Sequence, residues 1–386
     1  MSPHEHAVRV LVVTVVHDPA DARIRHRQIA AMVEAGWDVT YAAPFTAYGR
    51  EPVAGVTAVD LPRAAGRRRL GAVRAARRLL AARTADVDVV LLHDPDLLLA
   101  VPRRARRRGT AVVWDVHEDT AAAVTMRGWI PGPLRSLAAW GVRRAERWAE
   151  RHVDLVLAEP GYVARFARPH PVVPNSVRVP AAFPDAPVQD RVVYLGKLTA
   201  ARGARELVAL GAALASEVTV ELVGPATGEV ADELAAAAGR GDVDWAGFVP
   251  NDAALARLDG ALAGLSLLHD EPNYAHSQPT KVFEYMAHGL PVVTTPNPAS
   301  VQVVESAGAG LVVPFGDVAA AAAAVRRLRD DRPERDAMAR RGYDDVRQHH
   351  DWGADRVAFL GILDQFAHRA GSPSRDVPGT TPGNPA

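Results

Sequence analysis

The residues whose types and spacing most favour chemistry lie in one segment, PTKVFEYMAHGLPVVTT, at positions 279–295. Pro279 and Thr280 begin an expected helix, Lys281 lies in its first turn, and Glu284 follows one turn later. A cation near a helix N-terminus opposes the helix dipole unless an anion binds there. The placement therefore favours an anion site. The alternative is a solvated pair of Lys281 and Glu284 on the helix surface.

Lysine is rare in this chain. Lys197 and Lys281 are the two lysines among 45 basic residues, so each is expected where arginine does not serve. In the segment YLGKLTAARG, Gly196 ends an expected strand, and Lys197 and Arg202 lie on the turn before a helix. Two cations beside the free N–H groups of a helix suit a diphosphate. A turn with solvated cations is the alternative.

Composition bounds the class of protein. The 386 residues are 48% hydrophobic and 23% charged with a formal net charge of zero, which suits two globular domains. The absence of cysteine excludes disulfides, thiolate metal sites and cysteine nucleophiles. No apolar run reaches the roughly 18 residues of a membrane-spanning helix, and the first residues do not resemble a signal peptide. We therefore expect a cytoplasmic protein.

Short Val- and Leu-rich runs alternate with longer helical stretches, which predicts an α/β fold with parallel sheets. The Pro-rich segment 179–190 separates two such series. We predict an N-terminal domain over 1–182, a C-terminal domain with C-terminal helices over 183–370, and a disordered tail over 371–386. The expected strands are 8–16, 37–43, 87–92, 110–116 and 153–158 in the first series, followed by the runs RVVYLG, EVTVELVG, DVDWAGF, GLSLLH, LPVVTT and GLVVPF in the second.

In doubly wound sheets, ligands bind beyond the carboxyl ends of the strands. His117 follows the run TAVVWDV and is a candidate catalytic residue, although a lone histidine is more often structural. Asp18 and Arg23 follow the first strand, and Asp94 follows the run VDVVLL. These three residues are further candidates for binding at the same edge.

Several segments carry a resemblance. PTKVFEYMAHGLPVVTT and YLGKLTAARG resemble the donor-site helix and the phosphate-binding turn of retaining glycosyltransferases of family four. HDPADARIRHRQIAAMVEAGWDVT, WDVHED and VPNSV also resemble that family in type and order, so the resemblance covers nearly the whole chain. It implies the GT-B architecture, in which two Rossmann-like doubly wound domains face each other across a cleft.

The resemblance also implies roles for residues. Lys197 and Arg202 hold the diphosphate of a UDP- or GDP-linked sugar, and Glu284 binds the ribose hydroxyls. A sugar then moves to an acceptor hydroxyl with retained configuration, in glycan, glycolipid or glycosylated-metabolite biosynthesis, without a further cofactor. His276 replaces the first of two glutamates common in the family, and Lys281 compensates as a catalytic residue. The implied donor-binding set is Gly196, Lys197, Arg202, His276, Thr280, Lys281 and Glu284. We expect His117 to contact the sugar or the acceptor, and we assign Asp18, Arg23 and Asp94 to the acceptor side.

Other classes remain open at this point. A nucleotide-sugar epimerase shares the architecture, and a non-catalytic partner that binds a sugar nucleotide is a third class. Three Asp-x-Asp pairs, at 86–88, 94–96 and 242–244, have the spacing of metal-dependent transferases, but a diphosphate held by cations needs no metal, and we predict none. The lack of a G-x-G-x-x-G motif after the first strand disfavours a dinucleotide oxidoreductase.

The N-terminal half is basic although the chain is neutral. The stretch 63–83 predicts an amphipathic helix whose apolar face holds Leu70, Val73, Leu79 and Leu80, and 102–109 adds further arginines. Such a helix can lie on an anionic membrane, or it can cover the sheet with a solvated basic face. The asymmetry allows a lipid-linked or anionic acceptor and peripheral contact with the inner membrane face. Nucleic-acid binding is disfavoured, because no aromatic residues alternate with these arginines.

Overall fold

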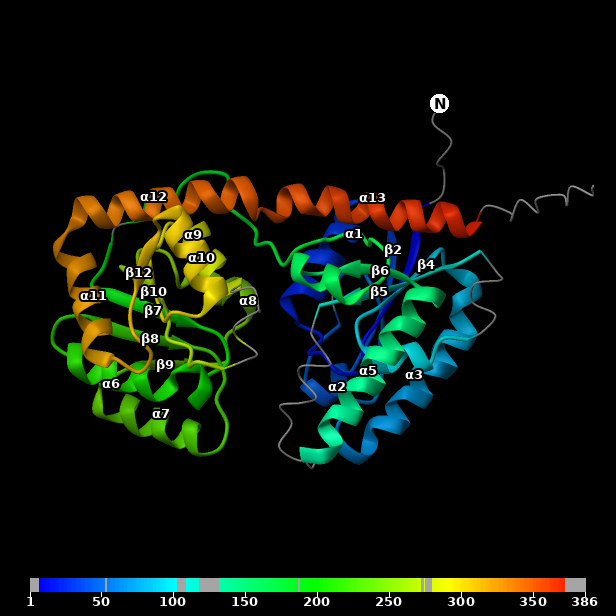
Figure 1. Cartoon of the computed structure of the whole chain (residues 1–386), viewed down its shortest axis with the longest axis horizontal. Helices are drawn as coiled ribbons and strands as arrows, with labels where there is room; N and C mark the ends of the chain where they lie inside the picture. Colours follow the sequence, from blue (N-terminus) through cyan, green and yellow to red (C-terminus); the bar gives the residue numbers. More distant parts are fainter. Residues whose placement is uncertain are drawn as a thin grey trace, which may run out of the picture.

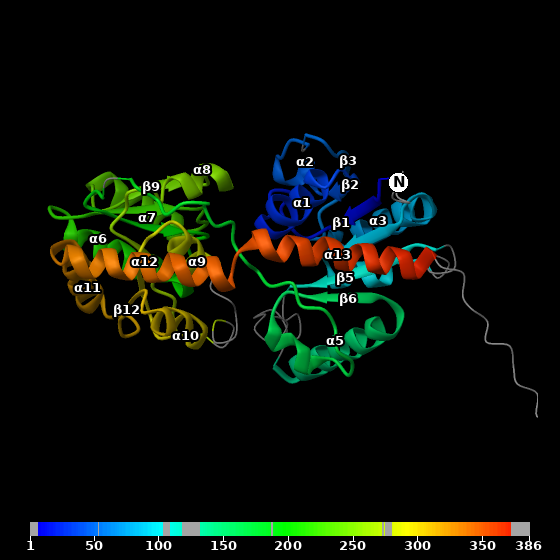
Figure 2. The same ribbon diagram turned by 90° about the horizontal axis from the view of Figure 1, so that it is seen from above.

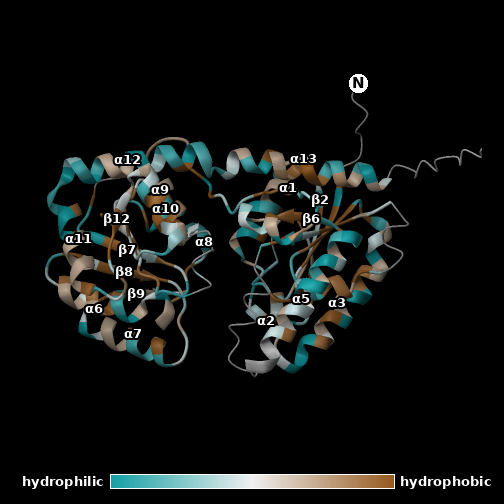
Figure 3. Ribbon diagram, viewed as in Figure 1, coloured by the Kyte–Doolittle hydropathy of each residue, from teal (hydrophilic) through white to brown (hydrophobic). Residues whose placement is uncertain are grey.

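The computed structural model describes residues 7–52, 54–102, 109–117, 132–186, 188–271, 274 and 280–371. The described residues form two parallel six-stranded sheets, each flanked by helices, in two units that lie next to each other (Figure 1). Figure 3 shows hydrophobic strands inside both units, because parallel strands are covered on both faces. The predicted two-domain α/β fold is confirmed.

The first sheet has the strand order β3-β2-β1-β4-β5-β6. Five of its strands match predicted runs. The edge strand β3 was not predicted, since it is short and only partly buried, which leaves little hydrophobic signal. The strands are β1 Arg9–Val13, β2 Asp38–Ala43, β3 Thr57–Asp60, β4 Val89–Leu92, β5 Ala111–Val116 and β6 Asp154–Leu157.

Helices cover both faces of this sheet. A π-helix, η1, continues into α1, and the side chain of Asp21 caps it by accepting from two backbone N–H groups. The helical elements are η1 Ala22–Ile29, α1 Ala30–Glu34, α2 Phe45–Tyr48, η2 Gly66–Arg68, α3 Arg69–Arg83, η3 Thr84–Asp86, η4 Pro95–Leu99, α5 Gly132–His152 and η6 Pro160–Arg165.

The predicted apolar face of α3 is right for Val73, Leu79 and Leu80, which pack into the core, and wrong for Leu70. The helix buries Ala72, Ala76 and Leu80 against the sheet, whereas the side chain of Leu70 is 69% exposed. Leu70 lies in the first turn, on the side of the helix that faces away from the sheet. Small alanines make the contact because they let the helix approach the strands closely.

The second sheet repeats the topology with the order β12-β11-β10-β7-β8-β9. All six strands correspond to predicted runs. They are β7 Arg191–Leu195, β8 Thr219–Val223, β9 Asp244–Gly247, β10 Ala263–Ser266, β11 Val292–Thr294 and β12 Gly310–Val312. The helices are η7 Ala200–Arg202, α6 Ala204–Leu214, α7 Glu229–Arg240, α8 Asn251–Ala256, α9 Thr280–Ala287, α10 Pro298–Ala307, α11 Val318–Asp330, α12 Arg332–His349 and α13 Trp352–Gly371.

The last helix corrects the expected domain division. α13 was placed with the C-terminal domain, but it runs along the N-terminal unit (Figure 2). Trp352, Phe359 and Leu363 are fully buried in the same core cluster as residues of β1, β4 and β5. These apolar side chains find their partners on the first sheet, so the chain returns to it after α12.

The chain therefore crosses between the two units twice, and backbone hydrogen bonds join the two crossing segments. The N–H of Val177 donates to the carbonyl of His350 at 3.0 Å, and the N–H of Trp352 donates to the carbonyl of Val177 at 2.8 Å. His350 also stacks on Phe283 of α9, with ring centres 4.1 Å apart. This junction fixes how the two sheets face each other, and α9 is in direct contact with it.

Candidate functional site

A cavity of about 460 Å³ lies between the two units, beyond the carboxyl ends of their strands. This is the position that the topology favours, since each sheet reverses its strand order there. Both units contribute to the wall. The lining includes Asp21, Arg23, Arg27, His117 and Asn175 from the N-terminal unit, and Gly196, Arg202, Phe248, Thr280, Lys281 and Glu284 from the C-terminal unit.

Two glycines form one wall of the cavity. Gly196, after β7, has φ of 120°, and Gly224, after β8, has φ of 151°. A Cβ atom on Gly224 would lie 1.9 Å from the carbonyl oxygen of Gly196, so this approach requires glycine. A Cβ on Gly196 would lie 3.7 Å from Nζ of Lys281 and 3.9 Å from Nη1 of Arg202. The glycines thus leave room beside two cations.

Lys281 presents a buried cation without a described partner. Its Nζ has no hydrogen-bond partner in the described part of the chain and lies 3.8 Å from the ring centre of Tyr194. Burial lowers the pKa of Lys281 well below its ordinary value, and the positive charge of Arg202 lowers it further. An ammonium group held beside a guanidinium near a helix N-terminus can bind an anion.

Glu284 faces the cavity one turn after Lys281. Burial raises the pKa of its carboxyl group, while the positive charges of Arg27 and Lys281 oppose this rise. Nζ of Lys281 has no hydrogen-bond partner among the described residues, so it does not bond to Glu284. The alternative of a solvated surface pair does not fit, because Nζ of Lys281 is buried and both residues line the cavity between the units.

Lys197 differs from its expected position. Its side chain is exposed and does not line the cavity, whereas Arg202, five residues later, does. The N–H of Leu198 bonds to the carbonyl of Pro225, and the carbonyl of Lys197 accepts from the hydroxyl of Tyr194. The backbone of Lys197 therefore supports the site while its side chain points to solvent. His276 lies outside the described residues, and Thr280 lines the cavity at the start of α9.

Two of the expected acceptor-side residues serve other groups. Arg23 is buried and makes a bidentate bond to Asp115, at 2.8 Å from Nε and 2.7 Å from Nη2. Its Nη1 also binds Asn175 at 3.0 Å, which ties the first crossing to the N-terminal unit. Asp94 is buried and accepts from the N–H groups of Val15 and Val16. The charged groups of both residues are occupied by the protein itself. Arg23 nevertheless lines the cavity, whereas Asp94 does not, and the acceptor-side assignment of the two residues stays a prediction.

Asp18 also has a partner. Its carboxylate binds Arg50 at 2.9 and 2.8 Å, and the Arg50 guanidinium lies 4.1 Å from the ring centre of Phe248. Phe248 belongs to the C-terminal unit and lines the cavity. Asp18 therefore orients an arginine that bridges the two units at the cavity, a contact that the sequence alone did not indicate.

His117 is the sequence-predicted residue at the centre of a histidine cluster. Its Nδ1 lies 3.2 Å from the carbonyl oxygen of Asp115, and its Nε2 lies 3.1 Å from Nε2 of His17. Burial would lower the pKa of His117, but the hydrogen bond to Asp115 and its charge raise it overall. His17 was missed, although its place after the first strand was a usable signal.

His93 completes the cluster. It is buried, its Nδ1 lies 3.3 Å from the Asp115 carboxylate, and burial lowers its pKa. His93, Asp115 and His117 are close enough together to hold a metal ion. The Asp115 oxygens, however, already accept from Arg23 and from Gln28, and a cation would compete with that arginine. The set fits a hydrogen-bonded network better than a metal centre.

The Asp-x-Asp pairs do not converge on the cavity. Asp88 binds Arg9, Asp96 binds Arg69, and Asp242 binds Arg240. Each of these carboxylates binds a nearby arginine, and none of them lines the cavity that contains Lys281.

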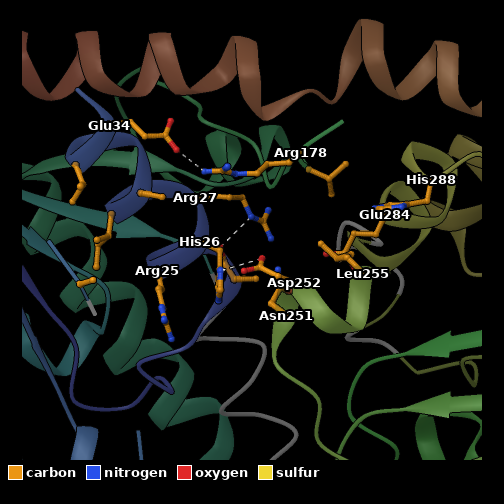
Figure 4. A pocket seen from close by; sticks show the side chains of 16 residues that line it. Arg25, His26, Arg27, Glu34, Arg178, Asn251, Asp252, Leu255, Glu284 and His288 are labelled. Atoms are coloured by element: carbon orange, nitrogen blue, oxygen red, sulfur yellow. Dashed lines mark hydrogen bonds and ion pairs between the residues drawn. The ribbon is translucent and has the colours of Figure 1, made fainter. Parts of the chain in front are cut away.

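A second cavity, of about 410 Å³, adjoins the first and shares Arg27, Asn251, Leu255 and Glu284 with it (Figure 4). His26 and Asp252 approach each other across it, with Nδ1 3.7 Å from the carboxylate. Figure 4 shows Glu284 and Leu255 entering from the C-terminal unit opposite Arg27. Glu284 is therefore accessible from both parts of the cleft.

Two facing doubly wound units with a cavity between them define the GT-B class of fold. Residues 21–182 match the glycosyl transferase 4-like domain, and residues 189–331 match the glycosyl transferases group 1 family. The chain therefore belongs to a glycosyltransferase family and is a transferase. No curated protein matches the sequence significantly.

Solved structures share the fold across the whole chain. Sucrose-phosphate synthase from Thermosynechococcus elongatus has a TM-score of 0.70 at 17% identity, covering 94% of this chain and 100% of that one. HepE from Anabaena in complex with UDP has a TM-score of 0.66 at 13% identity, covering 93% and 100%. WaaG, a glycosyltransferase involved in lipopolysaccharide biosynthesis, has a TM-score of 0.66 at 14% identity, covering 92% and 99%. No helix in the described ranges is long and apolar enough to cross a membrane.

Proposed function

We propose that this glycosyltransferase moves a hexosyl group from a nucleoside diphosphate sugar to an acceptor hydroxyl and retains the anomeric configuration, as family four members do. The observation that carries the donor assignment is the buried Lys281 ammonium, which has no hydrogen-bond partner in the described part of the chain and lies beside Arg202 and the glycine wall. A diphosphate supplies the missing anion. Arg202 and Lys281 then hold it, with Gly196 and Thr280 beside them.

The nucleoside extends from the diphosphate toward Glu284. A carboxylate at this place accepts hydrogen bonds from ribose hydroxyls, and Arg27 favours its ionised form. Uridine is the preferred base in this proposal, with guanosine as the alternative. The structures of HepE with UDP and with UDP-glucose support this choice, because that protein shares the fold.

The reaction needs no group on the protein that forms a covalent bond. In a front-face reaction, the bond from the anomeric carbon to the diphosphate breaks, and the acceptor oxygen bonds to the same face of the sugar. The leaving diphosphate takes the acceptor proton. Lys281 and Arg202 stabilise the charge that develops on the diphosphate, so the diphosphate needs neither a metal ion nor a further cofactor.

His117 lies on the opposite wall, where the sugar and acceptor meet. Its raised pKa favours a ring that donates a hydrogen bond to the sugar or the acceptor. His276, outside the described residues, is assigned to sugar selection. Asp18 contributes to the acceptor side by orienting Arg50 at the cavity.

The acceptor is proposed to be lipid-linked or anionic, in glycan, glycolipid or glycosylated-metabolite biosynthesis. The basic N-terminal unit supports this class of acceptor, as it does a cytoplasmic place of action with peripheral contact to the inner membrane face. An epimerase is not favoured, because the family matches are to transferases.

A thermal-shift series tests the donor assignment. UDP, GDP, ADP and their sugars are added to the unmodified protein and to Lys281→Met. A preferred diphosphate raises the melting temperature of the unmodified protein by mass action and does not raise that of the variant. If every nucleoside diphosphate leaves both melting temperatures unchanged, the donor site is wrong.

A further inference from the structure

One helix of the N-terminal unit presents an unusual solvent-facing surface. On α5, Leu137 is 61% exposed, Trp140 is 54% exposed and Trp148 is 43% exposed. The positions 137, 140, 144 and 148 follow helical spacing and lie on one side of the helix. Tryptophan and leucine rarely stay this open to water on adjacent turns, so this side of α5 has the composition of a contact surface.

The charged residues on the same helix separate by sign. Arg143, Arg144 and Arg147 are exposed beside the tryptophans, and the Arg144 guanidinium lies 5.8 Å from the ring centre of Trp140. Both acidic residues of α5 are buried. Glu146 pairs with Arg165, and Glu150 accepts from the N–H of Arg168 at 2.8 Å. The exposed side of α5 is therefore aromatic and cationic, with no acidic residue.

The neighbouring basic helix makes a useful comparison. α3 packs into the same core cluster as α5 and also exposes arginines, including Arg74, Arg77 and Arg78. It adds Leu70 as its one large apolar residue exposed to solvent. Figure 3 shows both helices on the lower side of the N-terminal unit. Charge is common to both helices, whereas the exposed indole rings belong to α5.

We infer that the exposed side of α5, formed by Leu137, Trp140, Arg143, Arg144, Arg147 and Trp148, docks on an anionic lipid bilayer. Tryptophan side chains prefer the membrane–water interface, where the ring is buried and its N–H stays solvated. Arginines between them attract anionic headgroups. A helix with this composition lies in the interface plane without spanning the membrane. The inference does not rest on the transfer reaction.

The absence of cysteine allows a site-specific test. Gly141→Cys places one label between the exposed side chains of α5, and Gly71→Cys places a matched label on α3. A Cβ at either glycine meets no atom within 4 Å, so both variants should fold. Each protein carries an environment-sensitive dye and is titrated with vesicles of phosphatidylcholine alone or of equimolar phosphatidylcholine and phosphatidylglycerol.

With anionic vesicles, we expect the fluorescence of the dye at position 141 to shift to the blue. The fluorescence of the dye at position 71 should change much less. Equal changes at both positions, or no change with anionic vesicles, would overturn the inference. Equal binding to neutral vesicles would overturn the assigned role of the arginines.

Charge and aromatic variants then separate the contributions. The pair Arg144→Gln and Arg147→Gln should weaken vesicle binding about 25-fold, from about fivefold for each arginine near an anionic surface. Trp140→Ala with Trp148→Ala should also release the protein from vesicles. The matched control, Arg77→Gln with Arg78→Gln on α3, should retain most of the binding. If the α5 variants instead reduce binding to duplex DNA and leave vesicle binding unchanged, the surface is a nucleic-acid site and the lipid assignment is wrong.

Discussion

Nζ of Lys281 lies 3.8 Å from the ring centre of Tyr194, and the positive charge of Arg202 is the largest cause of its lowered pKa after burial itself. Tyr194 belongs to β7 and Lys281 to α9, so the contact joins two elements that are 87 positions apart in the chain. A cation held over an aromatic ring without an anion leaves part of its binding capacity free. The following predictions depend on that arrangement.

Removal of the Lys281 charge should reduce donor use strongly. Lys281→Ala and Arg202→Ala each lose a charge-assisted bond of about 1.5 to 3 kcal/mol, or roughly 10- to 150-fold in kcat/KM. Lys281→Arg should lose activity as well, because a planar guanidinium does not fit the space of a compact ammonium above Tyr194. Initial rates with the sugar nucleotide measure each variant.

Lys197 supplies the matched control for this series. Its side chain is exposed, so Lys197→Ala should change kcat/KM by less than about threefold, as expected for a surface charge. Full activity of Lys281→Arg would contradict the assignment of Lys281 to the proposed diphosphate site. A loss in Lys197→Ala as large as that in Lys281→Ala would contradict it as well.

The same lysine should destabilise the nucleotide-free protein. Its folded-state pKa lies below the ordinary value of 10.5, so the unfolded chain binds more protons between the two values. The free energy of unfolding should therefore rise with pH across that window. The destabilisation caused by the buried charge of Lys281 is fully present below the folded-state pKa. Lys281→Met should raise the free energy of unfolding at neutral pH. Each kcal/mol gained should raise the melting temperature by about 2–4 °C.

Urea unfolding at neutral and alkaline pH, without nucleotide, measures this effect. The difference between Lys281→Met and the unmodified protein should shrink as pH rises. A variant that is less stable than the unmodified protein at neutral pH would show that Lys281 is satisfied in the free protein. Lys197→Met should leave the pH dependence unchanged.

Glu284 and His276 should affect different parts of the donor. Glu284→Gln weakens hydrogen-bond acceptance from ribose, so affinities for free UDP and for the UDP-sugar should fall by similar factors, about 5- to 30-fold for a bond of roughly 1 to 2 kcal/mol. His276→Ala should leave the affinity for free UDP nearly unchanged and alter the transfer rate or the preferred sugar. Titration calorimetry and initial rates separate the two. Unchanged UDP binding by Glu284→Gln would remove α9 from the donor site.

Transfer should not require a divalent metal. In the proposed donor site, Arg202 and Lys281 neutralise the diphosphate, and one carboxylate of each Asp-x-Asp pair already binds an arginine. Initial rates measured in excess EDTA should match those in untreated enzyme. A complete loss that manganese restores would return the metal-dependent mechanism to consideration.

The glycine wall should tolerate no side chain. In Gly224→Ala, the new Cβ would lie 1.9 Å from the carbonyl of Gly196 in a backbone conformation that favours glycine. We expect a loss of more than about 1 kcal/mol in stability together with weaker UDP binding. Gly239→Ala in α7, where a Cβ meets no atom within 4 Å, is the control and should keep both properties. Equal UDP affinity in the two variants would show that the wall is not in contact with the nucleotide.

The sequence by itself determined the α/β pattern and pointed to the segment to which we assign the donor chemistry. Strands buried on both faces leave continuous Val- and Leu-rich runs, and 11 of the 12 strands overlap a predicted run. The segment around Lys281 and Glu284 was informative because both residues lie within one helical turn. Their spacing in the chain already fixes their spacing in space.

Only the tertiary structure decided which distant groups meet. Both lysines follow similar local signals, yet Lys281 is buried beside Arg202 while Lys197 points to solvent. Likewise, α13 packs on the first sheet, and Arg23 binds Asp115, 92 positions away. Such contacts depend on how the elements pack, and side-chain type and local periodicity do not specify that packing. The tertiary structure also decided which side of α5 faces water. Glu146 and Glu150 are on the buried side because they bind Arg165 and the N–H of Arg168.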